Sequence, residues 1–521
     1  MLATVLSATL HGLDGRIIRV EVDVAPGLPG FSIVGLADAA LQESRERVRG
    51  AIRNAGFVYP PRRITVNLAP ADLRKGGASL DLGIALGILL GSEQVRANGR
   101  WAVLGELSLG GEVRNVPGLL PMLAALARRG VRRAIVPQDG LAEARLVGGI
   151  EAFAVATLGA AAELIRAPRS RRRRPTAPER VDLAPEADAP LAPDPAVALA
   201  DVPDLSEVRG QVEARRALEI ALAGGHGLLM VGPPGAGKTL LARTIPGLLP
   251  PLDDQESLSA TVIDSVAGAH PITGLVRRPP FRTPHHTISY AAMVGGGPRL
   301  SPGEVTLADH GVLFLDELPE FDRDVLEALR EPLEEGRVAI SRVGRATTFP
   351  ARFQLVAAMN PCVCGWLGDA SDQCRCTPPM LDRYRARVSG PLLDHIDLHV
   401  EVPRVSVSSL AEDTPATESS AAIRVRVLAA RARATIRLAR LGIAVNAHIP
   451  GREVRRVCRI DARGRRLLEA ASDRLGLSAR AYTRILRVAR TIADLNGEDE
   501  ITTAHLAEAI QYRSLDRRPR A

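Results

Sequence analysis

The segment that most constrains this chain is GPPGAGKT at residues 232–239. It fits the pattern G-x-x-x-x-G-K-[S/T], in which a glycine-rich loop presents backbone N–H groups to phosphates. Apolar residues 228–231 before it predict a buried strand, and the residues from Lys238 onward predict a helix. Because this motif works at a strand-to-helix turn, the chain is expected to contain a parallel α/β sheet that binds a nucleotide.

The loop lysine also stands out in the composition. Lys238 and Lys75 are the two lysines among 67 basic residues, so the remainder are arginines. A lysine ammonium is a compact point charge that fits between two phosphates, whereas a guanidinium is planar and wider. We expect Thr239 to bind Mg²⁺. The residues expected to bind ATP are Gly232, Pro233, Pro234, Gly235, Ala236, Gly237, Lys238, Thr239 and Leu240.

Two further apolar segments end in polar residues. Residues 312–315 predict a buried strand that ends at Asp316 and Glu317, and FQLVAAMN predicts another that ends at Asn360. A carboxylate at the carboxyl end of a strand beside the phosphate loop can hold Mg²⁺, and its neighbour can orient the attacking water. With Lys238, these residues form the predicted catalytic set for nucleoside triphosphate hydrolysis.

Composition and periodicity divide the chain into four parts. Residues 1–166 alternate strand and helix signals, and residues 167–203 form a linker rich in proline, alanine and arginine. A second α/β region covers 204–403, and 404–521 is mostly helical. The predicted fold class is therefore α/β, with a parallel sheet around the phosphate loop and a helical C-terminal part.

Bulk properties narrow the class of protein further. Apolar runs stay shorter than the ~18 residues that a membrane helix needs, and the first residues lack the pattern of a signal peptide. A cytoplasmic protein without a membrane partner is expected. A net charge of +8 is compatible with a polyanion partner, whereas an aromatic content of 3% argues against binding by base stacking.

Longer motifs carry a family resemblance. The segments PPFRTPHHTISYAAMVGGG, GEVTLADHGVLFLDELPEF and GPLLDHIDLHVEV resemble the YifB/ComM family of magnesium-chelatase-like AAA+ ATPases. The resemblance covers nearly the whole chain except the linker. It implies a Lon-protease-like N-domain of the ChlI type, an AAA+ domain with a helix-2 insert, and a helical lid; the AAA+ domain of this sequence also contains a cysteine-rich loop. It also implies that residues 206–211 bracket the adenine.

The same resemblance implies a function. It suggests ATP hydrolysis in a homo-hexameric ring that acts on single-stranded or branched DNA, as a branch-migration helicase in natural transformation or homologous recombination. The alternative is a chelatase-type motor that remodels a protein or a metal-inserting partner. A third possibility, an ATP-dependent protease, is opposed by the N-domain. There Ser79 stands at the Lon nucleophile position, but the position of the Lon lysine holds Leu120, and a serine without a base is not activated.

The resemblance also assigns two positions in the C-terminal part of the chain. Arg480, at the start of a helix in the lid, resembles the sensor-2 arginine that reaches the γ-phosphate, and the alternative is one more surface arginine. His395 stands where relatives have an arginine that resembles the trans-acting finger, and histidine is shorter and mostly neutral at pH 7. Either the ATPase is weak, or Arg383, Arg385 or Arg387 substitutes, with Arg387 as the first choice.

A hairpin is expected between the two catalytic strands. EGRVAISRVGRATTFP predicts two strands with a tip at residues 342–344. In MCM-like helicases a hairpin at this place projects into the pore, which implies that Arg342 and Arg345 contact DNA. The alternative is a structural hairpin with solvated arginines.

Four cysteines lie close together in the sequence. Cys362, Cys364, Cys374 and Cys376 form the pattern C-x-C-x₉-C-x-C, and four thiolates can hold Zn²⁺ tetrahedrally. The spacing differs from the common C-x₂-C, so reduced thiols without a metal are the alternative. Cys458 stands apart in a helical segment and is expected to be packed in a core.

Overall fold

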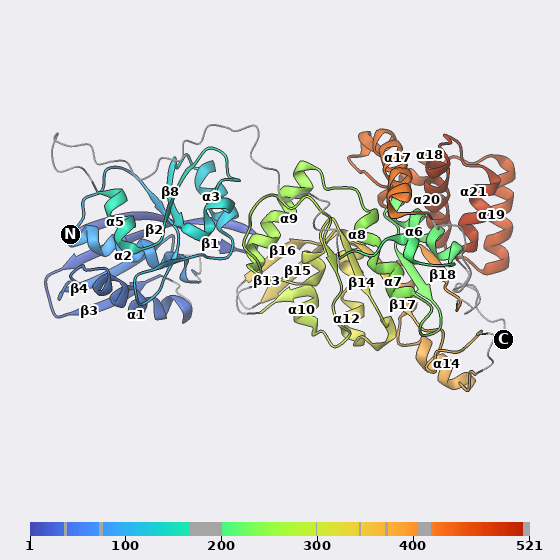
Figure 1. The fold of residues 1–521 in the computed structure, drawn as a ribbon, viewed down its shortest axis with the longest axis horizontal. Helices are drawn as coiled ribbons and strands as arrows, with labels where there is room; N and C mark the ends of the chain where they lie inside the picture. The colour runs from blue at the N-terminus through green and yellow to red at the C-terminus, as the bar shows by residue number, and fades with distance from the viewer. Residues whose placement is uncertain are drawn as a thin grey trace.

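In the computed structural model of the chain, an N-terminal α/β domain, a second α/β domain and a helical region follow one another along the long axis (Figure 1). The fold class predicted from the sequence is confirmed. Among the described residues, the helices are too short or too polar to cross a membrane. The structure describes residues 1–35, 39–71, 75, 77–166, 201–297, 300–342, 345–369, 373–404 and 418–513.

The N-terminal domain is built on a seven-stranded sheet with the order β3-β4-β2-β1-β5-β8-β9. Alternation along β2 buries Ile18, Val20 and Val22 on one face, as period-2 patterning requires. Helix α2 (Asp81–Gly91) is buried along nearly its whole length between this sheet and its neighbouring helices. The strands are β1 (Leu2–His11), β2 (Asp14–Ala25), β3 (Gly30–Val34), β4 (Arg63–Ala69), β5 (Ala102–Val103), β8 (Arg133–Pro137) and β9 (Glu151–Val155). The other main helices are α1 (Ala39–Asn54), α3 (Leu119–Arg128) and α5 (Leu158–Ile165).

The second domain has a five-stranded parallel sheet with the order β11-β14-β17-β10-β18. Its central strands are almost entirely apolar because helices cover both faces of such a sheet. The phosphate-loop strand β10 pairs with β17 on one side and β18 on the other, so the ends of the catalytic strands meet at one edge. The strands are β10 (Leu228–Val231), β11 (Phe281–Arg282), β14 (Val312–Leu315), β17 (Gln354–Met359) and β18 (Leu398–Glu401).

The helical region packs on this second domain through α6 (Val212–Gly224) and a buried polar link. His226, just before β10, lies 3.0 Å from Asp397 Oδ2 and 2.8 Å from Thr491 Oγ1. Thr491 belongs to α20, so the link ties the start of the phosphate-loop strand to the helical region. The helices are α17 (Ser420–Leu438), α18 (Gly451–Val457), α19 (Ala462–Leu475), α20 (Ala479–Asn496) and α21 (Thr503–Gln511).

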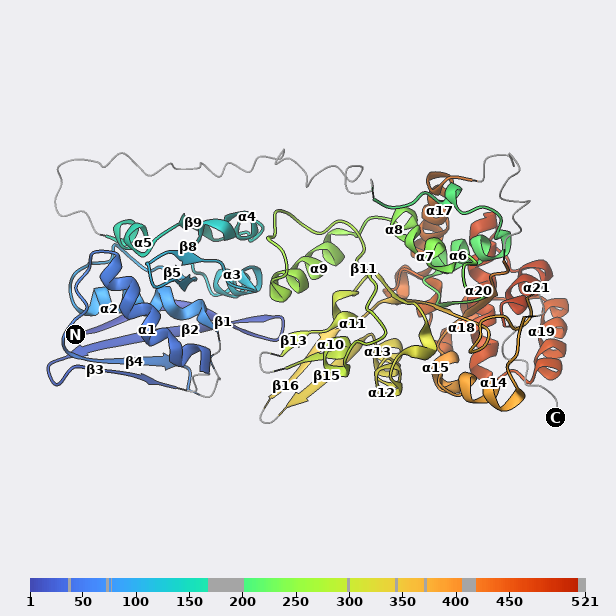
Figure 2. The same ribbon diagram turned by 60° about the horizontal axis from the view of Figure 1, so that its bottom comes forward.

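The N-terminal domain touches the second domain at the turn between β1 and β2, which points toward the hairpin of β15 (Arg337–Arg342) and β16 (Arg345–Pro350) (Figure 2). Leu13 in this turn packs against the core of the second domain. A Cβ on Gly12 would overlap Thr347 Cγ2, so a glycine is required for this approach. The turn therefore rests directly on strand β16.

A second contact joins α3 to the end of α9 (Asp254–Ala267). The Gly118 N–H donates to the Ser265 carbonyl at 2.7 Å. The buried Glu143 carboxylate accepts from the Leu120 N–H at 2.8 Å and from the Ser265 hydroxyl. Burial raises the pKa of Glu143, while these two donors oppose the rise. The two domains are thus joined by hydrogen bonds as well as by apolar packing.

Candidate functional site

The phosphate loop has the backbone that its glycines permit. A Cβ on Gly232 would overlap the Val402 carbonyl oxygen, so the first glycine is needed for close approach to the end of β18. Gly235 and Gly237 have φ angles of 76° and 90°, in the left-handed region that glycine adopts without strain. Helix α7 (Lys238–Arg243) begins at Lys238, so its N-terminal N–H groups face the loop and can bind anionic oxygens.

Lys238 lies at the centre of this loop. Its ammonium donates to the carbonyl oxygens of Gly232 at 2.6 Å and Pro233 at 2.9 Å, and to Asn360 Oδ1 at 3.3 Å. Burial lowers the pKa of Lys238, and the charges of Asp316 and Glu317 oppose this shift. The lysine and the polar end of β17, far apart in the sequence, are therefore brought into direct contact.

The two acids after β14 adopt different orientations. Asp316 Oδ2 accepts a hydrogen bond from the Thr239 hydroxyl at 2.6 Å, which places two oxygen ligands of the kind that Mg²⁺ prefers side by side. Glu317 has a φ of 53°, which is uncommon for a residue other than glycine, and its N–H donates to Asp316 Oδ1 at 2.9 Å. Glu317 is exposed, so this kink leaves its carboxylate accessible next to the loop.

Sequence reasoning missed His286 as a site residue. Its Nδ1 lies 3.4 Å from Glu317 Oε2, and its ring packs edge-on against Phe321. The two consecutive histidines of FRTPHHTISY are a visible feature of the sequence, but they do not indicate which acidic residue lies next to them in the fold. Because His286 comes from the segment between β11 and α10 (Tyr290–Val294), only the folded chain reveals that it is a neighbour of the glutamate.

The segment 206–211 ends against the phosphate loop. Gln211 Nε2 donates to the Ala236 carbonyl at 3.0 Å and to the Pro403 carbonyl at 2.6 Å, from a left-handed backbone with a φ of 54°. This contact brings the segment to the nucleotide loop. Its role in bracketing the adenine stays a prediction.

Arg387 lies on the same side of the domain as the two acids. Its guanidinium donates to Glu320 Oε2 at 2.9 Å and to the Pro319 carbonyl at 3.3 Å, in the turn that follows Glu317. Arg383 and Arg385 are exposed on α14 (Pro378–Arg385). The assignment of Arg387 as the finger stays a prediction.

Arg480 and His395 lie at the opposite edge of the sheet from Lys238. Glu334 Oε1 is 3.0 Å from His395 Nε2 and 3.8 Å from Arg480 Nη2. His395 precedes β18 and lies near Gly227, at the amino ends of the strands, whereas the phosphate loop follows their carboxyl ends. Burial and the nearby Arg484 lower the pKa of His395, so its imidazole is neutral at pH 7. In the described structure, both residues therefore lie away from the phosphate loop of the same chain.

The four clustered cysteines converge in space. Cys362 Sγ lies 3.4 Å from Cys364 Sγ and 3.8 Å from Cys374 Sγ, and Cys364 and Cys374 are 3.7 Å apart. The four sulfur atoms, including that of Cys376, lie within 4.8 Å of one another. Cys458 is buried at the end of α18, where burial raises the pKa of its thiol to about 12, as expected for a packed residue.

The predicted hairpin is confirmed as β15 and β16. Val338 and Phe349 on its inner face are buried, and the register runs from Arg337 opposite Pro350 to Arg342 opposite Arg345. The side chains of these last two arginines lie outside the described part of the structure. Their contact with DNA stays a prediction.

The N-terminal domain holds its serine in a backbone contact. The Ser79 hydroxyl donates to the Ala8 carbonyl at 3.2 Å, and the buried Lys75 ammonium donates to the Pro70 carbonyl. Leu120 is buried at the position expected for the Lon lysine. The absence of an activated serine stays a prediction.

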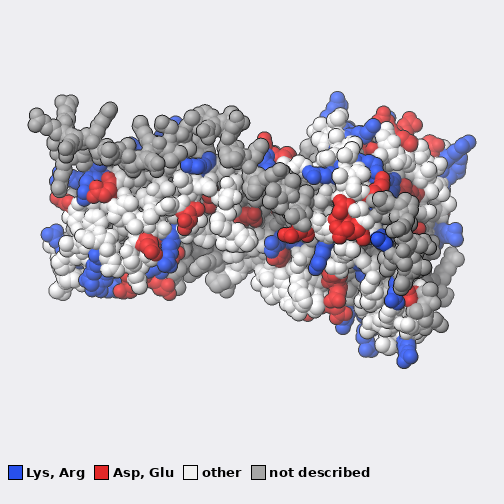
Figure 3. All heavy atoms as spheres, in the orientation of Figure 1, with Lys and Arg blue, Asp and Glu red and all other residues white. Residues whose placement is uncertain are grey.

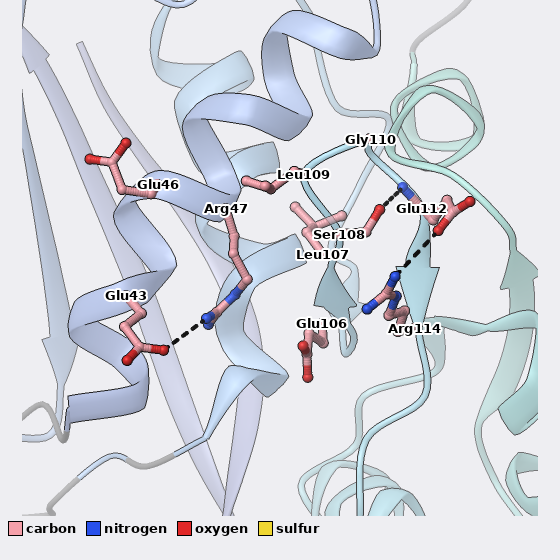
Figure 4. Close-up of a pocket in the computed structure, with 10 residues that line it drawn as sticks. All are labelled: Glu43, Glu46, Arg47, Glu106, Leu107, Ser108, Leu109, Gly110, Glu112 and Arg114. Carbon is pink, nitrogen blue, oxygen red and sulfur yellow. Dashed lines mark hydrogen bonds and ion pairs between the residues drawn. The ribbon is translucent and has the colours of Figure 1, made fainter.

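A groove of about 630 Å³ opens on the same domain, between α1 and the β6–β7 hairpin (Glu106–Leu107 and Val113–Arg114) (Figure 4). Arg47 beneath it pairs with the buried Asp81 at 2.6 Å. Four glutamates against two arginines make the lining acidic on balance, unlike a site for phosphates. The lining residues are Glu43, Glu46, Arg47, Glu106, Leu107, Ser108, Leu109, Gly110, Glu112 and Arg114.

The phosphate loop, the strand-end acids and the polar end of β17 on a parallel sheet, followed by a helical lid, define a P-loop ATPase of the AAA+ class. Family models for magnesium chelatase subunit ChlI match residues 20–140, 204–410 and, for its C-terminal part, 417–513. The chain is 44% identical to the uncharacterized protein YifB of Escherichia coli, over 97% of this chain and 96% of that protein. It is 42% identical to competence protein ComM of Haemophilus influenzae, over 99% and 98%. The chain belongs to the YifB/ComM family of magnesium-chelatase-like AAA+ ATPases.

Proposed function

We propose that this protein is an ATP-hydrolysing, homo-hexameric motor that acts on DNA as a branch-migration helicase in natural transformation and homologous recombination. The observation that carries the ATPase part is the contact of Lys238 with Asn360 beside the Thr239–Asp316 pair. In this proposal Thr239 and Asp316 hold Mg²⁺, which neutralises phosphate charge when it is bound. Glu317 orients the attacking water and Asn360 helps to align it.

The proposed ring rests on the separation of Arg480 from Lys238. An arginine at the opposite edge of the sheet can stabilise phosphate charge only in the site of another chain. Helix α17 offers a surface for such an assembly, because its outer face exposes Val425 at 66%, Leu428 at 40% and Ile436 at 79%. These residues recur at helical spacing, and a second copy of this chain would cover them.

The proposed DNA substrate rests on the hairpin and on the relative named as a competence protein. On the face drawn in Figure 3, basic and acidic side chains are interspersed, so the charge on this face does not indicate where DNA would bind. The deciding experiment is ATPase activity with and without forked or four-way DNA. Stimulation supports the DNA motor. An unchanged rate would favour the chelatase-type motor, which the matches to magnesium chelatase models keep as the second candidate.

The hairpin gives a separate prediction. Replacing Arg342 and Arg345 together with alanine should weaken DNA binding and lower the slope of log K against log salt by about 1 for each phosphate that is no longer neutralised. The matched control is Arg337→Ala at the base of the same hairpin, where the side chain pairs with Glu335 at 2.9 Å. Fluorescence anisotropy at several salt concentrations measures both quantities. If the double variant bound DNA with the same affinity and the same salt slope as the wild-type protein, the hairpin would have a structural role only.

A further inference from the structure

The four-cysteine cluster lies in a loop that packs against the candidate ATPase site. Cys362 follows Asn360 by two residues, on the loop that leaves β17. Gly365 in the same loop has a φ of 85°, and a Cβ there would lie 2.6 Å from Pro234 Cδ. The cysteine loop therefore packs directly on the phosphate loop.

Two more contacts fix this loop to the site. The Tyr384 hydroxyl, on the helix that follows the cysteines, donates to the Asn360 carbonyl at 3.2 Å. The Arg404 guanidinium lies 5.7 Å from the centre of the Trp366 ring. Asn360 thus precedes the cysteine loop in the chain, accepts a hydrogen bond from α14 through its carbonyl, and contacts Lys238 through its amide oxygen.

The sulfur positions fit a tetrahedral metal. Zinc–sulfur bonds of about 2.3 Å place the sulfur atoms of a tetrahedron about 3.8 Å apart. The three sulfur–sulfur distances of 3.4, 3.7 and 3.8 Å are close to that value. All four candidate ligands are thiolates, and thiolate ligands favour zinc over harder cations.

We propose that zinc bound by Cys362, Cys364, Cys374 and Cys376 positions Asn360 and the phosphate loop, so that ATP hydrolysis depends on the metal while ATP binding does not. Without the metal the loop loses its cross-link, and Asn360 shifts relative to Lys238. A displacement of about 1 Å at a catalytic group can cost about 10² in rate. This inference rests on the proposed ATPase activity and extends it to a second metal.

The test measures zinc content, ATP binding and ATP turnover on the same full-length samples. Purified protein should hold one zinc per chain by elemental analysis. Removal with a chelator should lower turnover about 10²-fold and leave the Kd for a fluorescent ATP analogue within about threefold, and added Zn²⁺ should restore turnover. Cys374→Ser should behave as chelated protein, whereas the control Cys458→Ser should keep both zinc and turnover.

The outcomes separate the metal site from the ATPase. Protein that neither holds zinc nor takes it up during titration would overturn the metal site, whatever its ATPase rate. Zinc-free protein with wild-type turnover would overturn the positioning role. Zinc-loaded protein without turnover would contradict the ATPase proposal, while its zinc content would still support the metal site. Chelation and reloading of the wild-type chain make the test independent of whether the Cys374→Ser variant folds.

Discussion

Glu317→Gln should bind ATP normally and hydrolyse it about 10²–10⁴ times more slowly than the wild-type protein, the range for losing a positioned base. The exposed carboxylate of Glu317 stands beside the phosphate loop, held by the kink after Asp316, and an amide there cannot accept a proton from water. Phosphate release measures turnover, and a fluorescent ATP analogue measures binding. The amide keeps the size of the side chain, so the fold and the Mg²⁺ ligands should be unaffected.

A matched control is Glu335→Gln, which neutralises an exposed acid that pairs with Arg337, outside the phosphate-loop contacts. It should hydrolyse ATP at the wild-type rate. If Glu317→Gln also turned over at the wild-type rate, the glutamate would not be the base, and its neighbour His286 would be the next group to replace.

Subunit mixing gives the second large effect. Arg480→Ala alone should lower turnover by about 10³–10⁵, the value of an arginine that stabilises transition-state charge from a neighbouring subunit. Lys238→Ala should remove ATP binding. An equal mixture of the two variants should regain about a quarter of wild-type turnover. In rings that assemble at random, about one interface in four places an intact phosphate loop of one subunit next to an intact Arg480 of its neighbour.

The control mixture combines Lys238→Ala with Glu317→Gln. Both residues serve the same loop within one chain, so this mixture should stay inactive. An inactive Arg480→Ala and Lys238→Ala mixture would contradict action between subunits.

His395→Arg should change turnover little if Arg387 already supplies the finger, and Arg387→Ala should then abolish turnover without blocking ATP binding.

The parts of the site that were predictable from the sequence are those set by local spacing. The loop at 232–239 requires a strand before it and a helix after it, and β10 and α7 are found there. The strand before Asp316 was predictable because a run of four apolar residues is too short for a buried helix and has the length of a buried parallel strand. The convergence of four cysteines likewise followed from their short separation.

Contacts between distant segments were not predictable. The distance from His286 to Glu317 and the packing of Gly365 on Pro234 depend on loops whose paths follow no periodic pattern. The location of Arg480 at the far edge of the sheet depends on how α20 packs on the domain, which its own amphipathic pattern does not specify. The sequence identified Pro234, Glu317 and Arg480 as candidates but not His286 or Gly365, and tertiary packing decided the neighbours of all five.

The turn between β1 and β2 makes the N-terminal domain a poor candidate for truncation. Leu13 packs against the core of the second domain, and Gly12 lies against Thr347 of the hairpin. Deleting the N-terminal domain would therefore expose apolar residues of the second domain and free one side of β16. A shortened chain that aggregates or loses activity would reflect that exposed surface, and it would say nothing about whether the protease-like fold has a ligand.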